Sequence, residues 1–184
     1  MCGRIGQFSA WQSYIEALAL FRDAASSIEE NRPRFNVGPG TKILTIYPDG
    51  IIRYVWWGFR PHWAIARKVP QMINARADKI TGSAWKPMLK SGRVIIPCDS
   101  WYEWVKDDDG KKQPYLLHAK DKGSLFLAGL TNVKDEDSSG PRNAGKPQVS
   151  LMVRLSLLMH PMRAWWTSTI VARWPCPQLT HNFG

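Results

Sequence analysis

The chain has 184 residues, which is enough for one globular domain with a sizeable core and too few for two full domains. Its 44% hydrophobic and 22% charged residues exclude a disordered or collagen-like protein. It has no apolar run long enough to span a membrane and lacks the pattern of a signal peptide, so we expect a cytoplasmic protein. Three cysteines without a Cys-x-x-Cys pair favour a reducing compartment and no structural metal.

The charge is strongly positive and unevenly distributed. The formal net charge is +10, from 25 Lys and Arg against 15 Asp and Glu, and ten tryptophans accompany it. Cations that meet phosphates and indoles that stack on unpaired bases are typical of nucleic-acid binding. Residues 138–184 contain five Lys and Arg and not one Asp or Glu, so the composition changes abruptly near residue 138.

The predicted elements begin with an amphipathic helix over residues 9–27, where apolar residues recur at three- and four-residue spacing and Ser9 is the N-cap. Residues 31–40, with two prolines and two glycines, predict an irregular loop. Residues 42–47 and 51–57 flank a Pro-Asp-Gly turn and predict a β-hairpin.

The second half of the predicted elements contains mostly strands. Residues 60–70 predict a loop, residues 73–78 a short polar segment, and residues 83–90 a helix. Residues 134–146 predict a polar surface loop. Four strands are predicted over 93–97, 100–106, 113–119 and 125–130, with a hairpin turn at 107–110. Together these elements predict an α+β domain with antiparallel strands.

Cys2 has the first candidate reactive group. If the preceding methionine is removed, Cys2 carries a free amine beside its thiol. The amine titrates near about 8 and the thiol near about 8.5, so both nucleophiles are partly available at neutral pH. Together they can capture an aldehyde, the amine as an imine and the thiolate by closing a thiazolidine ring. The alternative is that Cys2 is an incidental second residue.

The segment from Asn74 to Asp78 combines an amide, a guanidinium and a carboxylate. Asn74 can orient a reactive amine or bind a sugar oxygen, and Arg76 can hold a phosphate through two parallel hydrogen bonds. The alternative is a solvated helix start that Asn74 caps.

Glu103 lies in the sequence Trp-Tyr-Glu-Trp, which places one carboxylate among three aromatic rings. Desolvation there would raise its pKa toward neutrality and suit it to general acid–base work. The alternative is a glutamate that faces solvent from an edge strand, with Tyr102 and Trp104 on the opposite face.

Five segments in one order carry a family resemblance that covers residues 1 to about 132. The sequence resembles the SOS-response-associated peptidase (SRAP) family, whose members are abasic-site processing proteins. The segments are Met-Cys-Gly-Arg at 1–4, Phe-Asn-Val-Gly-Pro at 35–39, Trp-Gly at 57–58 with Pro61 and Trp63, Asn-Ala-Arg-Ala-Asp at 74–78, and Pro-Cys-Asp-Ser-Trp-Tyr-Glu-Trp at 97–104.

The resemblance implies a single compact domain with mainly antiparallel strands around a barrel-like core and a basic groove for single-stranded DNA. Self-removal of Met1 would expose Cys2 as the nucleophile that forms a thiazolidine crosslink with an abasic site. Asn74 would position the amine and the opened sugar, and Glu103 would move protons. We expect a monomer that needs neither metal nor organic cofactor, with abasic single-stranded DNA as its partner.

The resemblance also implies a set of DNA contacts. Arg4 and Arg76 would hold phosphates, Asn36 and Pro39 would line the lesion pocket, and Trp63 would stack on or wedge against a base. Two other functions stay open at this point. One is a non-covalent module for single-stranded nucleic acid, and the other is a thiol protease, which would need a Cys–His pair.

The tail departs from the family, whose members carry an Ile-His-Asp-Arg segment that this chain lacks. The residues from Ser156 onward can be reverse-translated with one set of synonymous codons and then read in a frame that starts one base earlier. The result is TTDASDEGLVDIHDRRPLALSP, which resembles that segment. The single codons of Met and Trp force three of these residues. We therefore expect an incomplete domain over 1–149 and an aberrant, out-of-frame tail over 150–184, with crosslink reversal and lyase activity impaired by loss of the family His.

Overall fold

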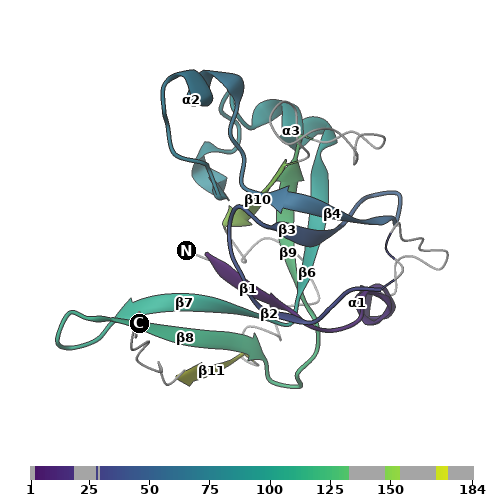
Figure 1. The fold of residues 1–184 in the computed structure, drawn as a ribbon, viewed down its shortest axis with the longest axis vertical. Helices are drawn as coiled ribbons and strands as arrows, with labels where there is room; N and C mark the ends of the chain where they lie inside the picture. Colours follow the sequence, from purple (N-terminus) through teal and green to yellow (C-terminus); the bar gives the residue numbers. More distant parts are fainter. Residues whose placement is uncertain (1–2, 19–27, 29, 133–147, 154–168, 174–184) are drawn as a thin grey trace, which may run out of the picture.

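The chain forms two β-sheets and three short α-helices in the computed structural model, which describes residues 3–18, 28, 30–132, 148–153 and 169–173 (Figure 1). The helices are α1 (Trp11–Leu18), α2 (His62–Ala66) and α3 (Lys86–Ser91), with a 3₁₀ turn, η1, at Ala77–Lys79. The strands are β1 (Arg4–Gln7), β2 (Arg34–Val37), β3 (Lys42–Ile46), β4 (Ile52–Trp57), β5 (Asn74–Arg76), β6 (Arg93–Cys98), β7 (Ser100–Lys106), β8 (Lys112–Ala119), β9 (Leu125–Thr131), β10 (Gln148–Val153) and β11 (Thr169–Arg173).

The strands are divided between two sheets. Sheet A has the order β11-β8-β7-β1-β2, and sheet B has the order β4-β3-β6-β9-β10-β5. Neighbouring strands run antiparallel except β10, which runs parallel to β5 and also to β4. The predicted α+β class with mainly antiparallel strands is confirmed, although the strands form two sheets and not one closed barrel.

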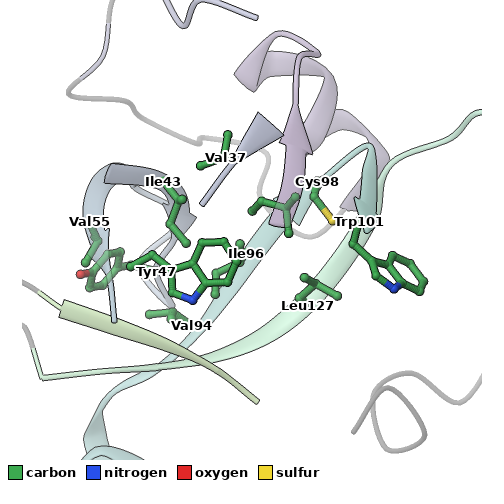
Figure 2. Packing of buried hydrophobic residues seen from close by; sticks show 11 residues of the cluster. Val37, Ile43, Tyr47, Val55, Val94, Ile96, Cys98, Trp101 and Leu127 are labelled. Carbon is green, nitrogen blue, oxygen red and sulfur yellow. The ribbon is translucent and has the colours of Figure 1, made fainter. Parts of the chain in front are cut away.

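The main core lies between the two sheets (Figure 2). Sheet A contributes Ile5, Val37 and Trp101 to it, and the largest buried side chain from sheet B is Trp57. The remaining sheet B members alternate along their strands, as expected where one face of each strand is buried. These members are Ile43, Val55, Val94, Ile96, Cys98 and Leu127, with Tyr47 just after β3.

Helix α1 covers the opposite face of sheet B. Its buried residues Tyr14, Ile15 and Leu18 pack against Leu44 and Ile46, which alternate with the β3 residues of the main core. Strand β3 is therefore buried on both faces, by sheet A on one side and by α1 on the other. The residues from Ile43 to Ile46 are accordingly all buried, including the polar Thr45.

The helix begins differently from the prediction. The Ser9 hydroxyl donates to Asp99, and Asn31 instead accepts a hydrogen bond from the Trp11 N–H at 2.7 Å while its amide donates to the Ser9 carbonyl. A residue distant in sequence thus supplies the cap. The described part of the helix ends at Leu18, and residues 19–27 of the prediction lie outside the described residues.

Some predicted loops contain regular structure. Residues 31–40 contain β2 and residues 60–70 contain α2, so both loop predictions are wrong in part. Residues 73–78 contain β5 and lead into η1, and the first strand, β1, was not predicted. The hairpin of β3 and β4, the four strands β6 to β9, and a helix near residues 83–90 are confirmed.

The tail is described only in part. The proposed boundary at residue 150 falls within β10, which pairs with β9, β5 and β4, and β11 pairs with β8. The predicted loop at 134–146 and the segments 154–168 and 174–184 lie outside the described residues. Across the described ranges, no helix is long and apolar enough to span a membrane.

Candidate functional site

Strand β1 is fixed to both sheets through Gln7. The buried Gln7 amide donates to the carbonyls of Leu44 and Pro97 at 3.1 and 2.7 Å, and it accepts from the Leu44 N–H at 3.0 Å. These hydrogen bonds join β1 to β3 and to the end of β6. Buried polar groups that are fully paired hold a unique arrangement, so the Gln7 amide fixes where β1 lies.

Asp99 anchors the chain that leaves β1. Its buried carboxylate accepts hydrogen bonds from the N–H groups of Phe8 and Ser9 and from the hydroxyls of Ser9 and Tyr14, at 2.5–3.0 Å. Burial and the hydrogen bond to Asp99 raise the pKa of Tyr14 far above its usual range. The corner between β6 and β7 thereby holds β1 and α1 together.

Arg4 lies against the loop that follows β2. Its Nη1 donates to the Asn36 side-chain oxygen at 3.4 Å. The guanidinium also lies over Gly38, where an added Cβ would be only 2.9 Å from Nη1. Pro39 is the next residue, and it is half-buried. Two of the predicted DNA-contact residues, Arg4 and Asn36, are thus in contact.

The register between β1 and β7 relates this group to Glu103. Arg4 lies opposite Tyr102, and Ile5 lies opposite Trp101. Because alternate residues of a strand point to opposite faces, Glu103 shares the face of Trp101, whereas Tyr102 and Trp104 share the other face. Glu103 is half-buried. Within the described residues, β7 pairs with β1 only from Ser100 to Tyr102, so Glu103 is paired with Tyr115 of β8 alone, and the alternative of a glutamate at a strand edge is not contradicted.

Asn74 and Arg76 lie on one face of β5, and Ala75 between them is buried in a core with Phe59, Trp85, Met88 and Leu130. Asn74 is part of a strand, and η1 begins at Ala77 with no side-chain cap, so the alternative that Asn74 caps a helix is wrong. The two polar side chains therefore project from a backbone that the buried Ala75 fixes.

Arg76 forms a bidentate ion pair with Asp78. Its Nε and Nη2 donate to the two carboxylate oxygens at 3.0 and 2.8 Å. The hydrogen bonds between them raise the pKa of Arg76 and lower the pKa of Asp78. Both side chains are more than half exposed, 62% and 57%, so the pair lies on the surface.

Trp63 projects from α2 with 47% of its surface exposed, beside Ile65 with 49%. The backbone pairing of Phe59 with Met72 closes the loop that carries this helix, and the Gln71 amide donates to the Gly58 carbonyl at 2.8 Å. A large exposed indole on a closed loop is suited to stack on an unpaired base.

Sequence reasoning missed an aromatic pair near Arg4. Phe8 and Phe35 stack with ring centroids 4.9 Å apart, and Phe35 is 63% exposed. The Tyr102 hydroxyl donates to the Phe35 carbonyl at 3.3 Å. The one available signal was that Phe35 immediately precedes Asn36, but an isolated phenylalanine in a predicted loop has no periodicity to reveal it.

Cys2 lies outside the described residues, and the described chain starts at Gly3. An added Cβ on Gly3 would meet no atom of the described chain within 4 Å. The backbone that leads into β1 therefore has open space beside it. Across the same described residues, no group of three or more His, Cys, Asp or Glu side chains is placed to hold a metal ion.

Comparison with known proteins gives a consistent result. The family model for SOS response associated peptidase (SRAP) matches residues 1–173. The abasic site processing protein YedK of Escherichia coli is 35% identical over 141 residues, and YoaM of Bacillus subtilis is 38% identical over 135 residues. Each match covers 71% of this chain and 59% of the relative, so the chain spans less than two thirds of these relatives.

Solved structures show the same fold. A phage-related protein of Bordetella bronchiseptica has a TM-score of 0.65 and 33% identity, over 82% of this chain and 68% of that one. A protein of Bacteroides thetaiotaomicron has a TM-score of 0.61 over 82% of this chain and 67% of that one. Its identity is 20%, so it supports the fold alone.

Proposed function

This chain belongs to the SOS response associated peptidase (SRAP) family, and from that premise we propose that it captures abasic sites in single-stranded DNA as a covalent crosslink through Cys2. The relatives YedK and YoaM are named abasic site processing proteins. The strongly basic composition and the exposed aromatic side chains support a nucleic-acid substrate.

The proposed chemistry has three steps. Hydrolysis of the peptide bond after Met1 first frees the α-amine of Cys2. This amine then adds to the aldehyde carbon of the ring-opened sugar and expels water, which leaves an imine. The thiolate attacks the same carbon while the imine nitrogen takes up a proton, and a five-membered thiazolidine closes. Glu103 is the proposed proton donor and acceptor for sugar opening and imine formation, and Asn74 the group that positions the amine.

The observation that carries this proposal is the antiparallel register of β1 with β7. Because Arg4 lies opposite Tyr102, the chain running back from Arg4 toward Cys2 follows the direction in which β7 proceeds to Glu103. A Cβ built on Gly3 would meet no atom of the described chain within 4 Å, so a side chain from elsewhere in the described chain does not cover this position. This arrangement supports a nucleophile and a proton-transfer group that act on one aldehyde.

The proposed DNA contacts come from both sheets and from α2. We assign Arg4 and Arg76 to backbone phosphates, since a guanidinium binds phosphate with two parallel hydrogen bonds. Asn36, which accepts a hydrogen bond from Arg4, and Pro39, which follows the glycine that Arg4 covers, would line the lesion pocket. The exposed indole of Trp63 would stack on a base next to the lesion.

The test is a crosslinking assay with an abasic oligonucleotide, read on a denaturing gel. We expect a heat-stable shifted band with the natural protein and none with Cys2→Ala or Cys2→Ser. Serine keeps the amine, but the oxazolidine it would form is far more labile than a thiazolidine. Cys98→Ala is the matched control and should keep the band, because Cys98 is fully buried.

Two results of this assay would contradict the proposal. A heat-stable band in either Cys2 variant would exclude a thiazolidine. Binding without any band in the natural protein would favour the alternative of a non-covalent single-strand binding module, which the exposed Phe35, Trp63 and Trp104 also support. An uncleaved N-terminal tag should likewise abolish the band, because the amine is then part of an amide.

We also propose that residues 150–184 are read out of frame, with the family His lost between the codons of Ser168 and Thr169. The acid-free composition of residues 138–184 and the shifted reading support this. Reversal of the crosslink and lyase activity would then be weak, whereas the amine and thiol of Cys2 would remain. Resequencing the gene across the codons for residues 146–156 tests the proposal, which requires a one-base gain or loss there.

A further inference from the structure

We propose that Asp78 is a built-in competitor for the phosphate that Arg76 binds, and that it weakens binding to intact single-stranded DNA more than binding at a lesion. The inference rests on the proposed function, because it takes Arg76 as a DNA contact. It assigns to Asp78 a role in specificity, distinct from the proposed chemistry of Cys2, Asn74 and Glu103.

The geometry of the ion pair carries the argument. Asp78 uses both carboxylate oxygens, at 3.0 Å from Nε and 2.8 Å from Nη2 of Arg76. This is the edge of a guanidinium that a phosphate uses in bidentate binding. A phosphate must therefore displace the carboxylate or bind at the other edge of the guanidinium beside it. On either route, the negative charge of Asp78 opposes the phosphate.

Asp78 could either compete with a phosphate for Arg76 or orient the guanidinium to receive one, and the exposure of the pair favours competition. Arg76 and Asp78 are 62% and 57% exposed, and such surface pairs hold their side chains only weakly. The gain from a pre-oriented guanidinium is therefore small. Asp78 occupies the Nε–Nη2 edge, however, so a phosphate that binds this edge must replace both of its hydrogen bonds.

The charge pattern along the chain also makes Asp78 distinctive. Residues 50–98 contain nine Lys and Arg and a single acidic residue, which is Asp78. That acidic residue forms its ion pair with one of the two arginines assigned to phosphate. A substitution of Asp78 therefore removes the only carboxylate that this segment supplies.

The competition distinguishes two kinds of DNA. An intact strand meets Arg76 from solution and must displace Asp78 anew in each encounter. A strand whose abasic site is already held at Cys2 and Asn36 presents its phosphate at a high effective concentration, so its contact with Arg76 forms despite the same displacement cost. Removing Asp78 should therefore raise affinity for intact DNA more than it accelerates capture.

The experiment compares Asp78→Asn with the natural protein in fluorescence anisotropy on an intact single-stranded oligonucleotide, at several salt concentrations. We expect the affinity to rise about fivefold and the salt slope to steepen by roughly 0.7, the value for one added single-strand phosphate contact. The rate of crosslinking to an abasic oligonucleotide should rise less than twofold. The double variant Arg76→Ala/Asp78→Asn should bind no more tightly than Arg76→Ala.

Asp108→Asn is the matched control, because Asp108 is exposed in the turn between β7 and β8 and the substitution removes the same charge. It should change the affinity for intact DNA less than twofold. An equal gain in both variants, a gain that persists without Arg76, or weaker binding by Asp78→Asn would each overturn the inference. These outcomes are separate from failure of the proposed function, which would show as no crosslink in the natural protein.

Discussion

The hydroxyl of Tyr14 donates to the buried carboxylate of Asp99 at 2.6 Å, and burial followed by this hydrogen bond raises the Tyr14 pKa. The folded protein therefore keeps this hydroxyl protonated, whereas the unfolded chain releases the proton above about pH 10. Stability contributed by Tyr14 is complete below about pH 10 and declines as the pH rises further, because the unfolded state then binds fewer protons.

The Tyr14→Phe variant tests this residue. At pH 7 it should lower the free energy of unfolding by about 1–2 kcal/mol, because Asp99 loses one donor. Between pH 9 and 11 its stability should fall less steeply than that of the natural protein. Urea denaturation at pH 7, 9 and 11 measures both effects. Parallel pH profiles for the two proteins would show that Tyr14 does not titrate as described.

At the residue scale, the sequence predicted candidate functional side chains better than it predicted their hydrogen-bond partners. Cys2 stays a prediction, because it lies outside the described residues. The prediction that Glu103 lies among three aromatic rings is wrong, because alternation along β7 places Tyr102 and Trp104 on the opposite face. The hydrogen bonds of the Asp99 carboxylate could not be predicted, because its partners Phe8, Ser9 and Tyr14 are 85–91 residues away in sequence. No local pattern reports a contact of that range.

Strand β1 owes its position to one side chain that reaches two other strands. Replacing Gln7 with Leu keeps the size but leaves the N–H and carbonyl of Leu44 and the carbonyl of Pro97 without this partner. We expect the free energy of unfolding to fall by about 2–4 kcal/mol. Urea denaturation measures the loss.

Gln12→Leu is the comparison for this prediction, because Gln12 lies on the exposed face of α1. Its effect should stay within about 0.5 kcal/mol. Equal losses in the two variants would mean that the hydrogen bonds of the Gln7 amide contribute little to stability, and that another contact positions β1.

At the scale of elements, predictability followed the range of the stabilising contacts. The β3–β4 hairpin was predicted because its Asp-Gly turn and alternation are local, and Gly50 adopts the positive φ of 80° that such a turn requires. Strand β2 was missed because its four residues are ordered by pairing with β1. Helix α2 was missed because five residues bounded by prolines show no periodicity.

At the scale of the whole molecule, the proposal that the tail is out of frame makes a testable prediction. A one-base insertion before the codon of Ser156 should restore the Ile-His-Asp-Arg segment. We expect the corrected protein to release its crosslink from abasic DNA faster than the natural protein does, because the restored His would assist imine chemistry. It should also unfold at a higher temperature, since the tail would regain a sequence suited to the fold.

A time course of crosslink release and a thermal unfolding curve provide the two measurements. The Cys2→Ala variant of the corrected protein is the control, as it should form no crosslink to release. A corrected protein that is no more stable and no faster in release would contradict the proposal of a lost reading frame.

The class of the fold followed from the sequence, because alternating strands with short turns allow little else than antiparallel sheets. The division of the strands into two sheets could not be predicted from the sequence. It depends on β3 being buried on both faces, and a short, mostly apolar run such as Ile43 to Tyr47 fits either a core strand or a buried helix segment. Only the packing of α1 and sheet A against the two faces of β3 shows that this run is a core strand.

The place of β1 between β2 and β7 has a consequence for the order of events during synthesis. The ribosome adds about 5–20 residues per second, so β7 emerges several seconds or more after β1. Until then β1 has its partner β2 on one side only, and neither Asp99 nor Glu103 exists in the nascent chain. The nascent chain therefore contains the proposed aminothiol of Cys2 before it contains Glu103, the proposed proton-transfer group. On the proposed mechanism, proton transfer by Glu103 is absent until the seventh strand has been made and has paired with β1, whereas the aminothiol itself can already react with aldehydes.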